Sequence, residues 1–188
     1  MQAQLLPGQL PQGGRQERRP DVQPGLRDAH RLPSSLPKQR GLHADAGQDV
    51  AMLNLGDVSI YATAAYLAEL LSADGYETCM VPGVTSFCAV AARLNTSLTG
   101  MNTPLHIVPG GCGEALDTTL AMPGAKVLMK SGKQLPGVLT ELARRGLLEH
   151  SALVCNCGLP GEQVYPDLSA FSPEQDAGYF ATIIVKED

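Results

Sequence analysis

Short apolar runs alternate with helical stripes along most of this chain, and this alternation constrains its fold more than any other feature. The runs suit strands that are buried in a sheet. They fall at residues 50–55, 77–81, 105–108, 125–129, 152–155 and 179–185. The stripes between them have the helical period and fall at residues 59–73, 86–94, 114–120 and 135–145. Alternating strands and helices predict an α/β fold, with a sheet covered on both faces.

Two of the expected helices carry clear end signals. Gly75 and Gly146 stand directly beyond the last turn, where glycine commonly ends a helix. Within the second of these helices, Glu141 and Arg145 are four residues apart, so they can pair on the solvent side. The inward stripe of this helix is wholly aliphatic and consists of Leu135, Val138, Leu139 and Leu142.

Residues 1–48 differ in kind from the rest of the chain. They hold six of the 14 prolines and eight glutamines, and they contain no aromatic residue. Their formal charge is positive, whereas that of residues 49–188 is negative. Such a segment cannot bury enough apolar surface to offset the entropy of ordering it. The composition therefore predicts a disordered segment up to residue 48 and one α/β domain over residues 49–188.

Charge, hydropathy and cysteine count limit the partners and the cellular location that we expect for the protein. A formal net charge of −5 argues against nucleic acid as a partner, since phosphate neutralisation needs clustered Lys and Arg. No apolar run approaches the length that crosses a bilayer, so we expect no membrane association. The N-terminus lacks the apolar centre of a signal peptide. Five cysteines without framework spacing predict reduced thiols, and hence a cytoplasmic protein.

Three turns share one arrangement, in which an apolar run ends and a small or glycine-containing segment reverses the chain. They lie at residues 54–61, 81–87 and 128–132. Ligands in open α/β sheets bind beyond the carboxyl ends of strands, where backbone N–H groups are exposed. Gly56 and Gly83 would let the backbone approach such a ligand closely. Taken singly, each turn is more often an ordinary strand-to-helix connection; three on one sheet edge favour a binding site.

The amino-acid sequences of these turns, and of one further segment, resemble those of a known family. Leu53–Asp57 reads LNLGD, Val81–Phe87 reads VPGVTSF, Val127–Lys130 reads VLMK, and Cys157–Glu162 reads CGLPGE. In order and spacing, residues 49–188 closely resemble the precorrin-2 C20-methyltransferases, including the cobalt-factor II enzymes, of the tetrapyrrole methylase superfamily. The resemblance implies an αβα domain with a mixed sheet. It also implies S-adenosylmethionine as methyl donor, a tetrapyrrole substrate of cobalamin biosynthesis, and a homodimer.

The same resemblance assigns residues to the methionine end of S-adenosylmethionine. This end would be lined by Leu55, Gly56, Asp57 and Ile60, with Tyr61 at the same wall.

The remaining assignments concern the other turns. Thr85 and Ser86 would contact the cofactor from the second turn, and Met129 and Gly158 would border its adenine and ribose. We expect no metal ligand set. Cys155-x-Cys157 lacks a second Cys or His pair that could complete a tetrahedral site, which favours two buried thiols.

The chemistry that the resemblance implies needs positioning more than a strong base. The methyl group of a sulfonium is already electrophilic and has only to be aligned with the tetrapyrrole carbon C20. No catalytic residue is therefore assigned. Asp57 could accept the departing proton, hold the cofactor, or simply cap its turn. The substrate carries eight carboxylates, for which Arg93, Lys130 and Lys133 are the candidate cations; each could equally be a solvated surface residue.

Two departures from the family pattern leave alternatives open. The glycine-rich loop that opens the family is not found in residues 1–48, and Val58 stands where the superfamily has Pro. A shifted or misassigned reading frame would explain residues 1–48. The chain could therefore be an active C20-methyltransferase, a truncated cofactor-binding remnant without catalysis, or a methylase acting at another ring carbon.

Overall fold

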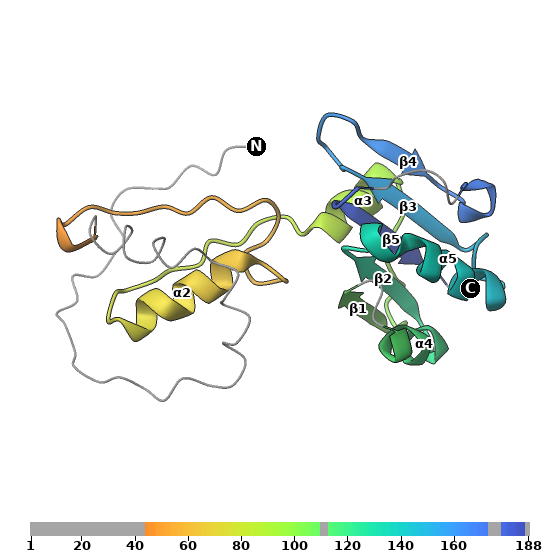
Figure 1. Cartoon of the computed structure of the whole chain (residues 1–188), viewed down its shortest axis with the longest axis horizontal. Helices are drawn as coiled ribbons and strands as arrows, with labels where there is room; N and C mark the ends of the chain where they lie inside the picture. The colour runs from red at the N-terminus through yellow and green to blue at the C-terminus, as the bar shows by residue number, and fades with distance from the viewer. Residues whose placement is uncertain (1–43, 110–112, 173–177, 187–188) are drawn as a thin grey trace. The chain divides into compact units, whose positions relative to one another are not determined.

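The computed structural model describes residues 44–109, 113–172 and 178–186 (Figure 1). Most of the segment 1–48, for which the composition predicts disorder, lies outside the described residues. The chain divides into two compact units, one ending at Gly83 and the other beginning at Val84. The boundary falls inside the range 49–188 that the sequence pattern treats as one domain. Each unit is described by itself.

The first unit is built around one helix, α2 (Thr63–Ala73). Leu67 is its buried residue, with 2% of its surface exposed. The helix ends as the sequence predicts: Gly75 has a φ of +88°, and the N–H of Tyr76 donates to Leu71 O at 3.0 Å. Its start is four residues later than expected, because Tyr61 has a left-handed φ of +49° and interrupts the pattern.

Two strands expected in the first unit do not form. Residues 50–55 and 77–81 carry no strand in the structure. Their apolar side chains are largely exposed: Leu53 is 90% and Leu55 67% exposed. A strand is stabilised by a hydrogen-bonded neighbour, and residues 44–83 contain no strand that could act as one. The prediction of strands here was wrong because an apolar run does not supply a partner.

The described residues of the second unit form a five-stranded sheet and three helices. Its strands are β1 (Leu105–Pro109), β2 (Ala125–Met129), β3 (Ser151–Cys155), β4 (Gln163–Tyr165) and β5 (Ala181–Val185). Its helices are α3 (Ser86–Arg93), α4 (Gly113–Ala121) and α5 (Leu135–Arg144), with short 3₁₀ turns at Gly132–Gln134 and Leu168–Ala170. Every element expected in this unit forms within two residues of its predicted bounds, and β4 is an addition.

The strand order is β1-β2-β5-β3-β4. β1 and β2 are parallel, while β5 runs antiparallel to both β2 and β3. β1, β2 and β3 therefore point in one direction and end at one edge of the sheet, where β5 begins (Figure 1). This mixed sheet is what the sequence resemblance implies.

Helices cover both faces of the sheet, as predicted. On one face, the aliphatic stripe of α5 packs with residues of α4 and with Leu128, Leu153 and Ile183 of the sheet. On the other face, Val90 and Ala91 of α3 pack on Val154 and Ile184. Neighbouring strand residues alternate between the two cores, because successive side chains point to opposite faces. The α/β fold class is confirmed.

In the ranges that the structure describes, no helix is long and apolar enough to cross a membrane.

Candidate functional site

Asp57 joins the first two of the three turns. One carboxylate oxygen accepts the N–H of Gly83 at 2.8 Å, across 26 residues of sequence. The other accepts the N–H of Ser59 at 2.8 Å and its hydroxyl at 2.5 Å. The Ser59 hydroxyl and the Gly83 N–H, together with the Ser59 N–H, lower the pKa of this carboxyl. Asp57 is therefore an ionised clamp between two turns.

Gly83 packs with its backbone directly against Gly56. A Cβ at Gly83 would overlap the carbonyl oxygen of Gly56, so no side chain fits between them. Gly56 itself has a φ of +95°, which glycine adopts without strain. The two glycines therefore let the two turns touch through their backbones.

The next residues along the chain begin α3. Thr85 is its N-cap residue, yet its side chain makes no capping hydrogen bond. Its Oγ1 is buried and has no hydrogen-bond partner among the described residues. A buried hydroxyl without a partner is costly, so the position favours a ligand that would bond to it. Ser86, the first residue of the helix, is half-buried.

The residues predicted to line the methionine end of the cofactor differ in exposure. Leu55 is 67% and Tyr61 45% exposed, while Ile60 is half-buried. Leu55 and Ile60 flank the Asp57 clamp in sequence. These side chains are available to a ligand in the first unit.

A second group of predicted residues lies at one edge of the sheet in the second unit. β2 ends at Met129 and β3 at Cys155, and each is followed by a left-handed residue: Lys130 has a φ of +58° and Asn156 a φ of +51°. β5 starts between them, since the N–H of Asn156 donates to Phe180 O at 3.0 Å. The structure thus places Met129 at the end of β2 and Gly158 shortly after the end of β3, at one edge of the sheet with β5 between the two strands.

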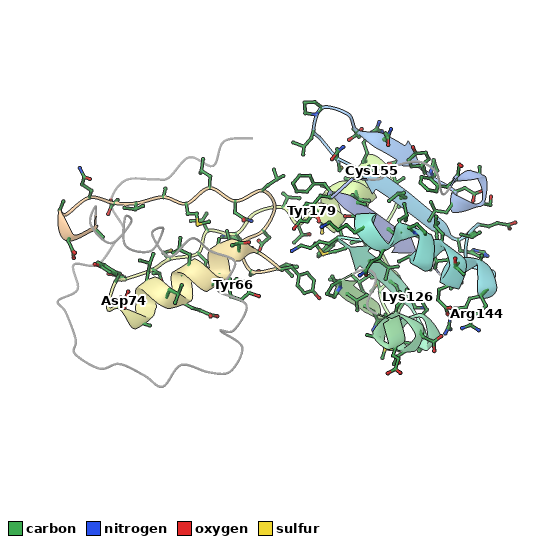
Figure 2. All side chains as sticks on the ribbon, viewed as in Figure 1. Tyr66, Asp74, Lys126, Arg144, Cys155 and Tyr179 are labelled. Atoms are coloured by element: carbon green, nitrogen blue, oxygen red, sulfur yellow. The ribbon has the colours of Figure 1, made fainter. Side chains whose placement is uncertain are left out.

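A small pocket of about 150 Å³ opens at this edge. Lys130, Lys133, Gln134 and Tyr179 contribute its side chains, and Gly132 its backbone. Tyr179, labelled in Figure 2, is 60% exposed. A Cβ at Gly132 would overlap Gly178 O, so the 3₁₀ turn and the segment that leads into β5 pack without a side chain between them. The two lysines predicted to face substrate carboxylates share one pocket.

The third candidate cation has a different neighbour. The Nε of Arg93, at the end of α3, lies 2.5 Å from Glu162 Oε1. The other oxygen of Glu162 accepts the N–H of Gly158 at 2.8 Å. Arg93 is therefore held by a carboxylate of this chain. No role was predicted for Glu162, although it closes the CGLPGE motif, because the pairing spans 69 residues of sequence.

The two cysteines at the end of β3 do not converge on one ion. Cys155 is 1% exposed and belongs to the core under α4 and α5, whereas Cys157 is half-buried and packs with the core under α3. The expectation of two buried thiols therefore holds for Cys155 and was wrong for Cys157. Burial raises the pKa of the Cys157 thiol, with the nearby Glu162 charge adding to the effect. Among the described residues, no group of three or more His, Cys, Asp or Glu side chains could hold a metal.

Relatives named as precorrin methyltransferases match this chain, two of them over about three quarters of its length. Cobalt-precorrin-2 C(20)-methyltransferase of Salmonella typhimurium is 31% identical over 144 residues, covering 76% of this chain and 60% of that protein. Precorrin-2 C(20)-methyltransferase of Sinorhizobium sp is 30% identical over 146 residues, covering 76% and 58%. Precorrin-4 C(11)-methyltransferase of Rhodococcus erythropolis is 46% identical over 59 residues, covering 31% and 24%. The chain thus spans about 60% of the length of the C20 relatives.

Solved structures share the fold. A cobalt precorrin-4 methyltransferase superposes with a TM-score of 0.67 at 19% identity, covering 80% of this chain and 69% of its own. The uroporphyrin-III C-methyl transferase of Thermus thermophilus, solved with S-adenosyl homocysteine, gives a TM-score of 0.59 at 21% identity, covering 80% and 71%.

The match to a family model agrees with the sequence relatives and with the solved structures. The tetrapyrrole (corrin/porphyrin) methylases match residues 10–170, a range that starts inside the segment the composition sets apart. The chain therefore belongs to the tetrapyrrole (corrin/porphyrin) methylase family.

Proposed function

We propose that this chain binds S-adenosylmethionine and takes part in methyl transfer to C20 of precorrin-2 or of its cobalt-containing form. The observation that carries the proposal is the Asp57–Gly83 contact, which brings two backbone turns of the first unit together. Thr85, two residues further along the chain, has a buried hydroxyl without a hydrogen-bond partner among the described residues. Family membership and the names of the two C20 relatives support the reaction and the substrate.

Residues of two kinds would hold the cofactor, which supplies an electrophilic methyl group on a sulfonium. The close contact of Gly83 with Gly56 brings the two turns together beside it, and Leu55 and Ile60 would give it apolar cover. The Thr85 hydroxyl fits a polar atom of the ligand because it otherwise stays buried without a partner.

Asp57 suits positioning better than proton transfer. Its hydrogen bonds to Ser59 and Gly83 keep its pKa low, so it is a weak base at neutral pH. We therefore assign it the role of orienting the two turns, and leave the C20 proton to solvent or substrate groups. The capping role, one of the three that the sequence leaves open, is the one that the contacts favour.

Lys130 and Lys133 are proposed to meet carboxylates of the tetrapyrrole. They line one pocket at the edge of an otherwise acidic chain, and local positive charge raises the concentration of an anionic substrate there. A homodimer and a cytoplasmic location complete the proposal, by analogy with the family.

Methylation at C11 is the second candidate reaction. The relative named for it shares 46% identity over 59 residues, more per residue than the C20 relatives share over their longer matches. The greater length of the C20 matches favours C20, because it covers 76% of the chain. A cofactor-binding remnant without catalysis is the third candidate.

Calorimetric titration with S-adenosylhomocysteine tests the cofactor site. Thr85→Val is expected to weaken binding by about tenfold, since it deletes one hydrogen bond. The same change should leave stability unaltered or raised by about 1 kcal/mol, because it removes an unsatisfied buried hydroxyl. Thr140→Val is the matched control: its exposed hydroxyl bonds to Pro136 O at 2.9 Å, so neither quantity should change much.

A methyl-transfer assay then separates the three candidates. The full chain is incubated with S-adenosylmethionine carrying a ¹³C methyl group and with precorrin-2, its cobalt form, or precorrin-4. A new ¹³C resonance from a methyl group attached to C20 supports the first proposal, and one from a methyl group attached to C11 replaces it with the second. Binding without transfer supports the remnant, and no binding of S-adenosylhomocysteine refutes all three.

A further inference from the structure

Glu162 contacts two different partners with its two carboxylate oxygens. Oε1 lies 2.5 Å from Nε of Arg93, and Oε2 accepts the N–H of Gly158 at 2.8 Å. The Gly158 N–H is the largest influence that lowers the pKa of Glu162, followed by the hydrogen bond from Arg93. The side chain thus connects the end of α3 to the turn that follows β3.

That turn has a backbone shape that needs support. Within six residues, Asn156, Gly158 and Gly161 have left-handed φ values of +51°, +73° and +80°. The side chain of Asn156 donates to Gly161 O at 3.3 Å, and Leu159 N donates to Asn156 O at 2.8 Å. A non-glycine residue in this conformation persists where its surroundings hold it.

Helix α3 connects this turn to another part of the proposed cofactor site. Its N-cap residue is Thr85 and its last residue is Arg93. Cys157, inside the turn, packs with the α3 core. A displacement of the helix end would therefore be transmitted to Gly158 through both contacts.

Stability alone gives a weak reason for this ion pair. The side chain of Arg93 is 53% exposed, and exposed pairs contribute little because solvent screens them. The hydrogen bond from the Gly158 N–H to the same carboxylate has another effect, because it fixes the position of the turn. The geometry favours a role in shape over one in overall stability.

We propose that Glu162 is a positioning residue, held by Arg93, which fixes the Gly158 turn in the form that receives the adenosine part of the cofactor. The inference rests on the proposed function. It also gives Arg93 a different task from contact with substrate carboxylates: Arg93 holds Glu162.

Three variants of the full chain separate the two contacts of Glu162. Glu162→Gln keeps an acceptor for the Gly158 N–H but loses the charge. Glu162→Ala loses both contacts. The double exchange Arg93→Glu with Glu162→Arg restores an ion pair but not the acceptor, because a guanidinium has donors alone. Each variant is measured by calorimetric titration with S-adenosylhomocysteine, by thermal unfolding, and by hydrogen exchange of the Gly158 amide in NMR.

The expected pattern divides affinity from stability. Glu162→Gln should bind within about threefold of the unaltered chain, whereas Glu162→Ala and the double exchange should each bind about tenfold more weakly. The Gly158 amide should exchange faster in the latter two variants alone. The double exchange should keep the unfolding temperature near that of the unaltered chain, although its affinity falls. If the ion pair acted through stability alone, affinity and unfolding temperature would change together.

Two results would overturn the inference while leaving the proposed function intact. One is unchanged affinity in Glu162→Ala. The other is full affinity in the double exchange, which would mean that the ion pair suffices. If the unaltered chain does not bind S-adenosylhomocysteine, the proposed function fails and the positioning role fails with it, whatever the Gly158 amide shows.

Discussion

The carboxylate of Asp57 accepts the N–H of Gly83 at 2.8 Å, and a Cβ at Gly83 would overlap the carbonyl oxygen of Gly56. Two turns that are far apart in sequence are therefore held together by the charged side chain of Asp57, and they can touch because Gly83 has no side chain. Both features serve the same close approach of backbones, and each can be removed separately.

Asp57→Asn removes the charge and leaves one acceptor for three donors. The side-chain amide can satisfy the N–H of Ser59 or that of Gly83, but its NH₂ group cannot accept the other. We expect affinity for S-adenosylhomocysteine to fall by roughly tenfold, as for the loss of one charge-assisted contact. Titration of the variant measures this. Unchanged affinity would show that the clamp is dispensable for the ligand.

Gly83→Ala tests the close approach itself. The added methyl group meets backbone atoms of Gly56, which cannot move aside as a flexible side chain would. Overpacking of this kind costs about 1–3 kcal/mol, so the urea midpoint should fall. Gly137→Ala on α5 is the control, because nothing lies within 4 Å of the position that its methyl group would take, and alanine favours a helix. It should be neutral or stabilising by about 0.5–1 kcal/mol.

Acid should unfold this protein partly through Glu141. Hydrogen bonds from Arg144 and then Arg145 lower its pKa from 4.5 to about 2. A carboxyl with a depressed folded-state pKa stabilises the fold above its unfolded pKa, and this contribution is lost as pH falls. The loss should occur between pH 4.5 and about pH 2. Urea unfolding at a series of pH values should show a weaker slope in that window for Glu141→Gln.

Arg144 and Arg145 also extend the interaction to α4. Both guanidinium groups bond to the carboxylate of Asp117, at 2.9 and 2.5 Å. Arg144 is labelled in Figure 2. The i,i+4 pair of Glu141 and Arg145 is predictable from helical spacing and is confirmed at 2.6 Å. If the stability of the unaltered chain and that of Glu141→Gln fall equally steeply with pH, these ion pairs are screened by solvent and do not stabilise the fold.

The sequence predicts the second unit well because its signals are local. β2 has the predicted bounds Ala125–Met129, and the aliphatic stripe of α5 is buried at all four positions. Periodicity reports which face of an element is apolar, and here a sheet is present to bury it. The contacts of the site were harder to predict from the sequence. The partners in the contacts Asp57–Gly83 and Arg93–Glu162 are 26 and 69 residues apart, and no spacing rule connects them.

The first unit shows the limit of the same reasoning. Residues 50–55 have the hydrophobicity of a buried strand, yet Leu53 is 90% exposed. Apolar character describes what a segment can bury, whereas a strand also needs a neighbour for its N–H and C=O groups. The convergence of the Gly56, Thr85 and Met129 turns on one ligand stays a prediction, because Gly56 belongs to the first unit whereas Thr85 and Met129 belong to the second.

Two leucine-to-alanine substitutions test this difference between the units. Leu142 on α5 is fully buried, so Leu142→Ala should cost about 2–5 kcal/mol through lost apolar contact and the cavity left behind. Leu53→Ala removes the same atoms from an exposed side chain and should change stability by about 0.5 kcal/mol or less. Urea unfolding followed by circular dichroism gives both values. A cost above about 1 kcal/mol for Leu53→Ala would contradict its exposure, because only a buried leucine loses that much; residues 50–55 would then have a packing partner after all.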